Sequence, residues 1–414
     1  MTAQPAVRMK PSTRLPVLVY VLAAGIFLMG TTEFMVAGLL PDVAADLGVD
    51  IAQAGLLVTA FAVGMIVGPP VMALATLRLP ARFTLVGALA VFAAGHVVAA
   101  LSESFAVVTA SRVVTALATG AFWATGAVVA AAVAGPGASA RALAVLSGGL
   151  SLAVVAGVPL GTFAGQFSGW RGPFWMLAVL ALPAIVAVLR FAPTTARDGP
   201  TQVSVGAEIA AVRPWRVWVL LGVIVLAQAG FLGAYSFISP LLTERAGIPV
   251  ALVPLVLVGF GIGALIGTTL GGRLGDRRPL ATITVAVSLT AALLLVLAAT
   301  AGDSAIVVVV VVLLGASGLG ANPVLIAQTL RFAGHGRLAS SLATSAFNLG
   351  TAAGSALAAT TLSTSLGLAG PAVLGAAVTG SALIPIALLA TTRPASEGNK
   401  AMDERSATKT LLTL

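Results

Sequence analysis

The segment from Val17 to Leu40 reads VLVYVLAAGIFLMGTTEFMVAGLL and carries a single carboxylate, Glu33. A run of about 20 apolar residues is long enough to cross a bilayer as a helix. A charged side chain inside such a helix costs at least about 2.5–3.5 kcal/mol unless it has a partner or a water-filled cavity. We therefore predict a functional role for Glu33. The residues that follow, Gly38 to Asp42, contain Pro41 and predict a turn that ends this helix.

The composition of the whole chain is also that of a protein that spans a membrane. Of its 414 residues, 59% are hydrophobic and only 8% are charged, against about 25% charged residues in soluble domains. The chain has no cysteine, which excludes disulfides, thiolate metal sites and cysteine nucleophiles. The apolar segment that begins at Val17 is too long for a signal-peptide core, so we expect it to remain as a helix. The sequence predicts an integral membrane protein.

Apolar segments recur along the chain in two sets of six, separated by a polar stretch. They lie at 17–40, 52–76, 83–101, 105–132, 142–165 and 170–190, and then at 215–240, 250–271, 280–300, 304–330, 338–363 and 371–392. We predict an all-α membrane protein with 12 transmembrane helices in two six-helix bundles. The expected parts are an N-terminal tail (1–14), a first bundle (15–191), a linker (192–213), a second bundle (214–392) and a C-terminal tail (393–414).

The positions of the basic residues indicate the orientation. If the N-terminus lies in the cytoplasm, 19 of the 22 basic residues fall in cytoplasmic segments, and only Arg171 and Arg245 fall in outer loops. Cytoplasmic loops are enriched in Lys and Arg, so we predict that both termini are cytoplasmic. The net charge of +9 is then a signal of topology, and nucleic-acid binding is not expected.

Glycines spaced four residues apart occur in the second and fifth segments of each set. Such faces allow helices to approach closely in lipid. We interpret them as sliding contacts between two halves that rock about a central site, with ordinary tight packing as the alternative. The positions are Gly64 and Gly68; Gly157, Gly161 and Gly165; Gly263, Gly267 and Gly271; and Gly350 and Gly354.

Arg112 is the second charge deep inside the first six segments. Glu33 lies about 9 Å from the outer end of its segment, and Arg112 lies about 10 Å from the outer end of its own, at 1.5 Å per helical residue. The two side chains are at similar depth and we predict that they pair, with Glu33 as a proton carrier. Snorkelling of Glu33 to the headgroups and a purely structural anchoring role for Arg112 are the alternatives. His96 is interpreted as a scaffold residue.

Substrate contacts are expected on the cavity-facing stripes of the fourth, seventh and tenth segments. A mostly apolar and aromatic pocket with a few polar anchors suits a neutral molecule of drug size. The alternative is that these side chains are core or face lipid. Helical spacing selects Thr115, Thr119 and Trp123 on the face of Arg112; Gln228, Phe231 and Tyr235 on the seventh segment; and Asn322, before Pro323, on the tenth.

Several motifs carry a resemblance to a known family. The residues GGRLGDRR at 271–278, which include Gly272, Asp276, Arg277 and Arg278, resemble the cytoplasmic signature loop of the major facilitator superfamily. The residues GVPLGT at 157–162, with Gly157, Pro159 and Gly161, look like the glycine-proline motif of its drug:proton antiporters. Arg112 stands where that group places a membrane-embedded arginine.

Further pieces narrow the resemblance to bacterial chloramphenicol efflux proteins and to the neighbouring sugar and arabinose efflux permeases. They are GTTEFM at 30–35, LPD at 40–42, GRL at 272–274 and AFNLG at 346–350. This resemblance implies a proton-coupled exporter in the bacterial plasma membrane that moves a small-molecule drug and protons by alternating access, without a cofactor or a metal. A sugar exporter of the same fold is the alternative. We expect a monomer.

Other classes are less compatible with the residues. An ATP-driven pump requires a phosphate-binding loop and a cytoplasmic nucleotide domain, and the inner segments are too short to fold one. A membrane-embedded enzyme remains a remote alternative, because no His or Cys dyad and no HExxH motif is present. We therefore expect a transporter and not an enzyme.

Overall fold

The computed structural model describes residues 15–75, 79–135, 138–192, 209–333 and 337–391. The predicted tails at 1–14 and 393–414, and most of the predicted linker at 192–213, lie outside the described residues. The described part of the chain is helical and contains no strand.

The first set of helices extends from residue 17 to residue 191. We call it the N-terminal helix group. Its elements are α1 (Val17–Leu47), α2 (Ile51–Ala75), α3 (Ala81–Leu101), α4 (Phe105–Ala134), α5 (Ser139–Leu152), the π-helical turn η1 (Ala153–Gly157), α6 (Val158–Ser168) and α7 (Arg171–Phe191).

The second set, the C-terminal helix group, extends from residue 215 to residue 391. Its helices are interrupted more often than those of the first set. The elements are α9 (Trp215–Tyr235), α10 (Ile238–Pro240), the π-helical turn η2 (Leu241–Arg245), η3 (Val250–Leu252), α11 (Val253–Arg277), α12 (Pro279–Ala299), α13 (Ser304–Gly320), α14 (Asn322–Phe332), α15 (Arg337–Thr361), η4 (Gly367–Ala369), α16 (Gly370–Ser381) and α17 (Leu383–Thr391).

The predicted end of the first helix at Pro41 is wrong. Helix α1 continues through Pro41 to Leu47 and ends at Gly48, whose φ of 64° lies in the left-handed region. A proline removes only one intrahelical hydrogen bond. Leu40 and Val43, on either side of Pro41, are almost fully buried, and this packing holds the helix together across it.

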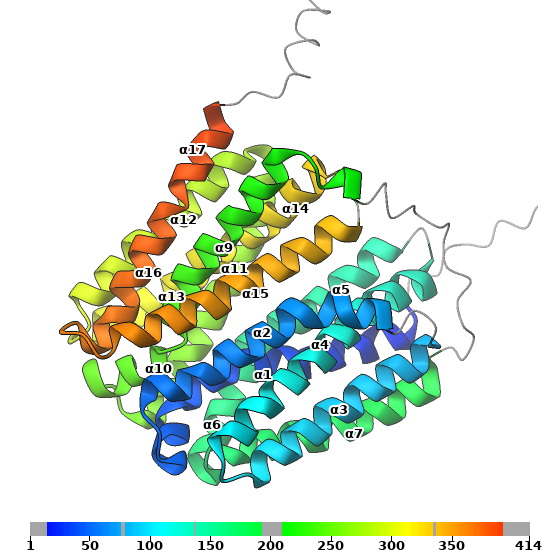
Figure 1. The fold of residues 1–414 in the computed structure, drawn as a ribbon, viewed down its shortest axis with the longest axis horizontal. Helices are drawn as coiled ribbons and strands as arrows, with labels where there is room; N and C mark the ends of the chain where they lie inside the picture. The colour runs from blue at the N-terminus through cyan, green and yellow to red at the C-terminus, as the bar shows by residue number, and fades with distance from the viewer. Residues whose placement is uncertain (1–14, 76–78, 136–137, 193–208, 334–336, 392–414) are drawn as a thin grey trace, which may run out of the picture.

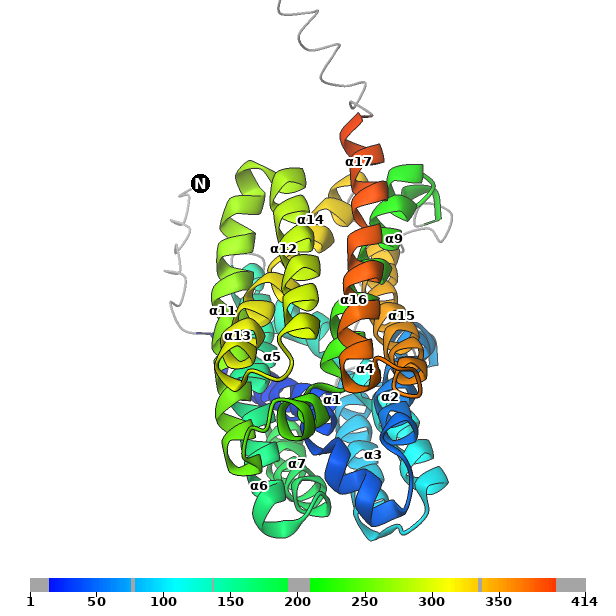
Figure 2. The same cartoon turned by 90° about the vertical axis from the view of Figure 1, so that its left-hand side faces the viewer.

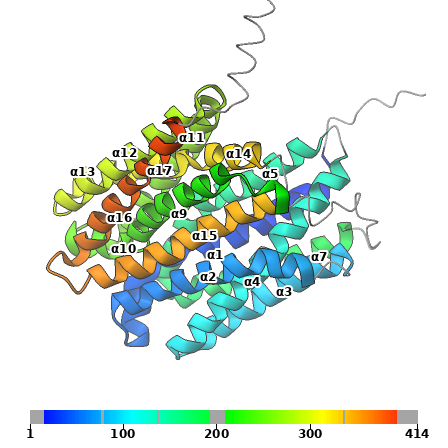
Figure 3. The ribbon, with the colours of Figure 1, turned by 45° about the horizontal axis from the view of Figure 1, so that its top comes forward.

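Eleven helical stretches of the described chain are long and apolar enough to span a membrane. Helix α15 has 25 residues but is rich in Ser, Thr, Ala and Gly, and it is not among the eleven. It lies between α2 and α9 (Figure 3). Ser355 and Thr59 approach each other at 2.6 Å, and Ser345 donates to the carbonyl of Ile66 at 3.2 Å. The polar residues of α15 therefore contact protein, which explains its low hydropathy.

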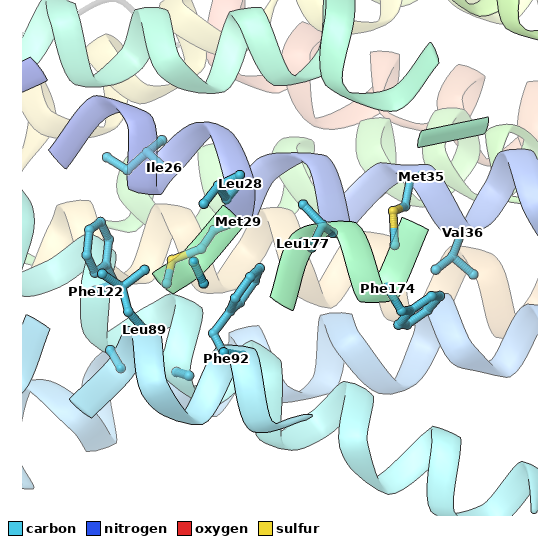
Figure 4. Packing of buried hydrophobic residues seen from close by; sticks show 14 of the residues in the cluster. Ile26, Leu28, Met29, Met35, Val36, Leu89, Phe92, Phe122, Phe174 and Leu177 are labelled. Carbon is cyan, nitrogen blue, oxygen red and sulfur yellow. The ribbon is translucent and has the colours of Figure 1, made fainter. Parts of the chain in front are cut away.

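The two helix groups lie side by side, with α2 and α15 running together at their boundary (Figures 1 and 2). The groups also meet where α11 packs on η1 and α6, and where α1 packs on α10. Helix α1 is held within its own group by an apolar core in which Met29 faces Phe92 of α3 (Figure 4), and Met35 lies beside Gly161 of α6. This packing fixes the rotation of α1 and hence the direction of Glu33.

The glycine faces lie inside the two groups and not between them. Gly161 of α6 lies beside Met35 of α1, and Gly267 of α11 lies against the backbone of Ala316 in α13. The prediction that these faces are sliding contacts between halves is therefore wrong, and tight packing within each half is correct. The other members behave in the same way: Gly64 and Gly68 face α4, Gly157 and Gly165 face α1, Gly263 and Gly271 face α13, and Gly350 and Gly354 face α9.

A different glycine makes the close approach between the groups. A Cβ atom on Gly261 of α11 would lie 2.5 Å from the Cα atom of Val155 and 2.8 Å from the carbonyl oxygen of Val154. Both valines belong to η1, which comes directly before Pro159. Proline has no N–H group and crowds the preceding turn, which favours such a π-helical bulge. The bulge and Gly261 together bring the two backbones into contact.

We predict that Gly267→Ala destabilises the protein. The added methyl group would meet the carbonyl oxygen of Ala316, a backbone atom that cannot turn away. Overpacking of this kind costs about 1–3 kcal/mol. Gly272→Ala on the same helix meets open space and is the matched control. Thermal unfolding of the two purified variants should give a lower midpoint for Gly267→Ala alone, and equal midpoints would contradict the packing described here.

Candidate functional site

A small cavity of about 20 Å³ lies between the two helix groups, and both contribute to its wall. This space is close to that of a single water molecule, so a drug-sized ligand requires the helix groups to move apart. The wall is mostly apolar, with a few polar side chains among the apolar ones. Its residues are Glu33, Phe34 and Ala37 of α1; Val58, Phe61 and Ala62 of α2; Leu232 and Tyr235 of α9, with Ser236; and Asn348 and Thr351 of α15.

Glu33 is the charged residue of this wall. Its side chain is partly buried, and within the described residues it has no hydrogen-bond or ion-pair partner. The ion pair that the described part of the chain contains joins Arg171 to Asp46. The predicted pair between Glu33 and Arg112 is therefore absent, although the charge of Arg112 is near enough to act on Glu33 through space. The carboxylate borders a cavity instead, which is the other setting that a charge inside a membrane protein can take.

Arg112 is almost fully buried, with 1% of its surface exposed, and its guanidinium forms hydrogen bonds with groups other than Glu33. Its Nη1 atom donates to the hydroxyl of Thr32 at 2.8 Å, and its Nη2 atom donates to the carbonyl oxygen of Thr32 at 3.0 Å. The Nε atom donates to the carbonyl oxygen of Leu57 at 3.5 Å. The guanidinium carbon lies 4.3 Å from the ring centre of Phe61. These contacts join α4 to α1 and α2, which is the anchoring role that the sequence left open.

His96 of α3 completes the polar cluster behind Glu33. Its Nε2 atom lies 2.8 Å from the Thr32 hydroxyl, and its Nδ1 atom lies 2.7 Å from the carbonyl oxygen of Phe92. The ring also packs on Phe92 and Phe174. Sequence reasoning treated His96 as scaffold and did not select Thr32. Thr32 could have been selected from the sequence, because it is a polar residue directly before Glu33 in an otherwise apolar segment.

Most of the predicted substrate residues lie away from the cavity. Thr115 and Thr119 are buried, and their hydroxyls donate to carbonyls of their own helix at 3.0 and 2.9 Å. Trp123 packs against the core of the N-terminal group, and Phe231 lies in a stacked arrangement with Phe260 at 6.1 Å. The face of α4 that carries Arg112 is turned into its own helix group, so its neighbours at helical spacing are turned inward too.

Gln228 and Asn322, each predicted as a substrate contact, bind each other outside the cavity wall. The Nε2 atom of Gln228 donates to Oδ1 of Asn322 at 2.8 Å. Asn322 begins α14 directly after the break that follows Gly320, with Pro323 in its first turn. The pair therefore ties α9 to the broken tenth segment, where a side-chain amide can stabilise an interrupted helix.

Tyr235 is the predicted substrate residue that does line the cavity. It ends α9, and its ring stacks on Phe260 at 4.6 Å. Its hydroxyl is buried and has no hydrogen-bond partner within the described part of the structure. Buried hydroxyls usually have a partner, so a ligand or a water molecule is expected at this one. Asn348, which the sequence marked only as part of the resemblance, lies on the same wall.

The motif residues lie at the ends of elements and not in the cavity. Gly157 closes η1 and Pro159 lies in the first turn of α6. Asp276 and Arg277 are exposed on the last turn of α11, Arg278 is exposed directly after it, and Gly272 is one turn earlier. The described residues contain no group of three or more His, Asp or Glu side chains that could hold a metal ion.

Comparison with known proteins agrees with this architecture. The model of the Major Facilitator Superfamily matches residues 22–355. A chloramphenicol resistance protein from Streptomyces lividans is 40% identical over 362 residues, which cover 86% of this chain and 92% of the relative. The inner membrane transport protein YdhP of Escherichia coli strain K12 is 34% identical over 374 residues, which cover 90% of this chain and 96% of the relative.

Three observations agree. The structure has many apolar helices, a cavity lies between its two helix groups, and the relatives match nearly the whole chain. The chain therefore belongs to the Major Facilitator Superfamily, and it is a multi-pass membrane transporter and not an enzyme.

Proposed function

We propose that this transporter exports small neutral drugs of the chloramphenicol type in exchange for protons. The observation that carries the proposal is the carboxylate of Glu33 on the wall of the cavity, without a partner in the described residues. A carboxylate inside a membrane protein costs free energy when it is charged, and binding a proton removes that cost. Glu33 is therefore suited to load a proton when the cavity faces one side of the membrane and to release it when the cavity faces the other.

The chemistry of the wall supports a neutral substrate. Phe34, Phe61 and Tyr235 provide aromatic surface, and Asn348 and Thr351 provide polar groups from the opposite helix group. A drug that occupies this space once the helix groups move apart lies beside Glu33, so substrate and proton compete for the same region. The relative from Streptomyces lividans, named a chloramphenicol resistance protein, supports a phenicol as the first substrate to test.

We propose a topology of 12 spans, with α15 as the span that composition alone does not identify, and with both termini in the cytoplasm of a bacterium. The distribution of basic residues supports this orientation. Residues 15–191 and 214–392 act as the two moving bodies, and the protein works as a monomer. Arg112 takes part in coupling through the effect of its charge on Glu33, and the motif residues Gly157, Pro159 and Asp276 serve the conformational change.

Alternating access requires that contacts between the groups break and re-form. Gln166 of α6 donates to the carbonyl oxygen of Val250 at 2.6 Å, and Thr59 bonds with Ser355. The backbone of η1 also contacts α11 at Gly261. Individual hydrogen bonds contribute only about 0.5–1.5 kcal/mol each, so a substrate or a proton can shift the balance between two states.

The direct test of function is export by the purified protein in proteoliposomes with an imposed pH gradient, with radiolabelled chloramphenicol as the probe. We expect accumulation that depends on the gradient, and drug tolerance in a host that expresses the gene. Export of arabinose without transport of chloramphenicol would show that the substrate is a sugar and not a drug. Equal export with and without a pH gradient would contradict proton coupling.

Glu33→Gln should abolish accumulation against a gradient while exchange of labelled for unlabelled drug continues. Glutamine keeps the shape of the side chain and removes the group that binds a proton. Glu244→Gln is the matched control, because Glu244 is exposed and lies away from the cavity. Flux in both directions should be measured in proteoliposomes. A Glu33→Gln protein that accumulates drug like the parent would refute the role of Glu33.

Tyr235→Phe should raise the KM for the drug about 3- to 10-fold, which is the effect expected for one lost neutral hydrogen bond. The unfolding midpoint should not fall, since the hydroxyl has no partner within the described residues. The chain has one other tyrosine, Tyr20, which is 54% exposed, and Tyr20→Phe is the control. An unchanged KM for Tyr235→Phe would mean that the drug does not contact this hydroxyl.

Gly261→Val should push the two helix groups apart, because the new side chain would meet the backbone of η1. The cysteine-free chain permits a direct readout. Ser355→Cys places a thiol at a fully buried contact between α15 and α2. Thiol labelling should be faster, and transport slower, when Gly261→Val is added to Ser355→Cys. Gly87→Val on α3, which points into open space and lies outside the motifs, should change neither rate. Slower labelling in the Gly261→Val background would show that the groups close instead.

A further inference from the structure

We propose that His96 is a positioning residue: in its neutral form, protonated on Nδ1, it orients the Thr32 hydroxyl so that this hydroxyl holds the guanidinium of Arg112. The inference rests on the proposed function, in which Arg112 acts on Glu33. It concerns a buried ring that lies outside the cavity wall and that the transport cycle described above does not use.

The direction of each hydrogen bond follows from what each group can donate. The carbonyl oxygen of Phe92 can only accept, so Nδ1 of His96 carries a proton. The guanidinium of Arg112 can only donate, so the Thr32 oxygen accepts from it. The Thr32 hydroxyl has one proton left, and Nε2 of a neutral ring has one lone pair to accept it. With a neutral ring, this arrangement satisfies all three bonds.

The orientation of the Thr32 hydroxyl differs from that of its neighbours in the chain. The hydroxyl of Thr31 donates to the carbonyl oxygen of Phe27, one helical turn earlier, at 2.8 Å. Thr119 and Thr162 make the same bond within their helices. This local bond is the usual choice of a threonine inside a helix. Thr32 instead points sideways to His96 and Arg112, so an external acceptor must hold it there, and His96 is that acceptor.

A protonated ring would not fit this cluster. Nε2 would then donate to the same Thr32 oxygen that already accepts from Arg112, and two positive charges would be separated by one hydroxyl group. The helices packed around the ring offer Arg112 from α4, Glu33 one residue beyond Thr32 on α1, and Phe174 from α7. Within the described residues no carboxylate contacts the ring. The neutral ring satisfies every donor and acceptor.

The consequence for coupling is geometric. Arg112 is held at Thr32, directly before Glu33, and does not pair with the carboxylate. If the Thr32 hydroxyl turns back to its own helix, the Nη1 bond is lost and the guanidinium can move. Its effect on Glu33, which acts through space, then changes. His96 thereby maintains the separation that leaves Glu33 free to exchange its proton.

Nitrogen-15 NMR of the histidine rings tests the first step without any substrate. The chain has two histidines, so His335→Ala leaves His96 as the only signal. We expect the signature of a neutral ring with a proton on Nδ1 at neutral pH. Thr32→Val in the same background should shift the Nε2 signal toward that of a nitrogen without a hydrogen bond. A proton on Nε2, or a doubly protonated ring, would overturn the proposal.

Transport in proteoliposomes tests the second step, with chloramphenicol as the probe. His96→Phe keeps a planar ring without the acceptor and should lower gradient-driven accumulation about fivefold or more, as expected for the loss of a bond to a charged network. His96→Gln supplies an acceptor and should retain most of the activity. Thr32→Val should match His96→Phe, and the double variant should be no worse than either single variant, since both act through one bond.

The outcomes separate this inference from the proposed function. Accumulation by Glu33→Gln at the parental level refutes the proton role of Glu33, and the NMR result then still decides the state of His96. Loss of accumulation in Glu33→Gln with parental activity in His96→Phe refutes the positioning role alone. Equal impairment of His96→Phe and His96→Gln, or additive losses with Thr32→Val, would refute the role of His96 as the acceptor for Thr32. If His96→Phe does not fold, the isosteric Thr32→Val provides the comparison.

Discussion

The structure depends on the cost of placing the guanidinium of Arg112 inside a membrane protein. The group is almost fully buried, and it is satisfied by the hydroxyl and carbonyl of Thr32, the carbonyl of Leu57 and the ring of Phe61. These partners belong to α1 and α2, so one buried cation fixes the relative rotation of three helices. Because Thr32 precedes Glu33, the same contacts determine which way the carboxylate of Glu33 faces.

The two charged side chains therefore have different surroundings. Arg112 is held by neutral partners, whereas Glu33 borders a cavity and has no partner among the described residues. A tight ion pair would hold both groups in place, since breaking a buried pair leaves an uncompensated charge. Separation leaves the carboxylate available for a proton, and the cation close enough to influence it through space. Phe61 connects the two regions, because it stacks on Arg112 and also lines the cavity.

Packing within and between the helix groups follows different rules. Inside each group, glycines such as Gly267 allow backbones to touch, which favours a rigid unit. Between the groups, α2 packs along α15, Gly261 of α11 approaches the π-helical turn, and side-chain hydrogen bonds such as that of Thr59 with Ser355 add to these contacts. Two rigid units that meet along such a boundary are suited to rocking as bodies, which is the motion that the proposed alternating access requires.

The sequence by itself determined the membrane class and most of the helices, and it singled out Glu33 as a candidate, because length, hydropathy and an isolated charge are local properties of a segment. It also selected Tyr235, but Thr115 and Phe231 proved to face away from the cavity. Only the tertiary structure decided that Arg112 binds Thr32 and not Glu33, that Gly161 packs on α1, and that α15 is polar because it contacts protein. The physical reason is that these outcomes depend on the rotation of each helix about its axis, which is set by packing against segments far away in the sequence.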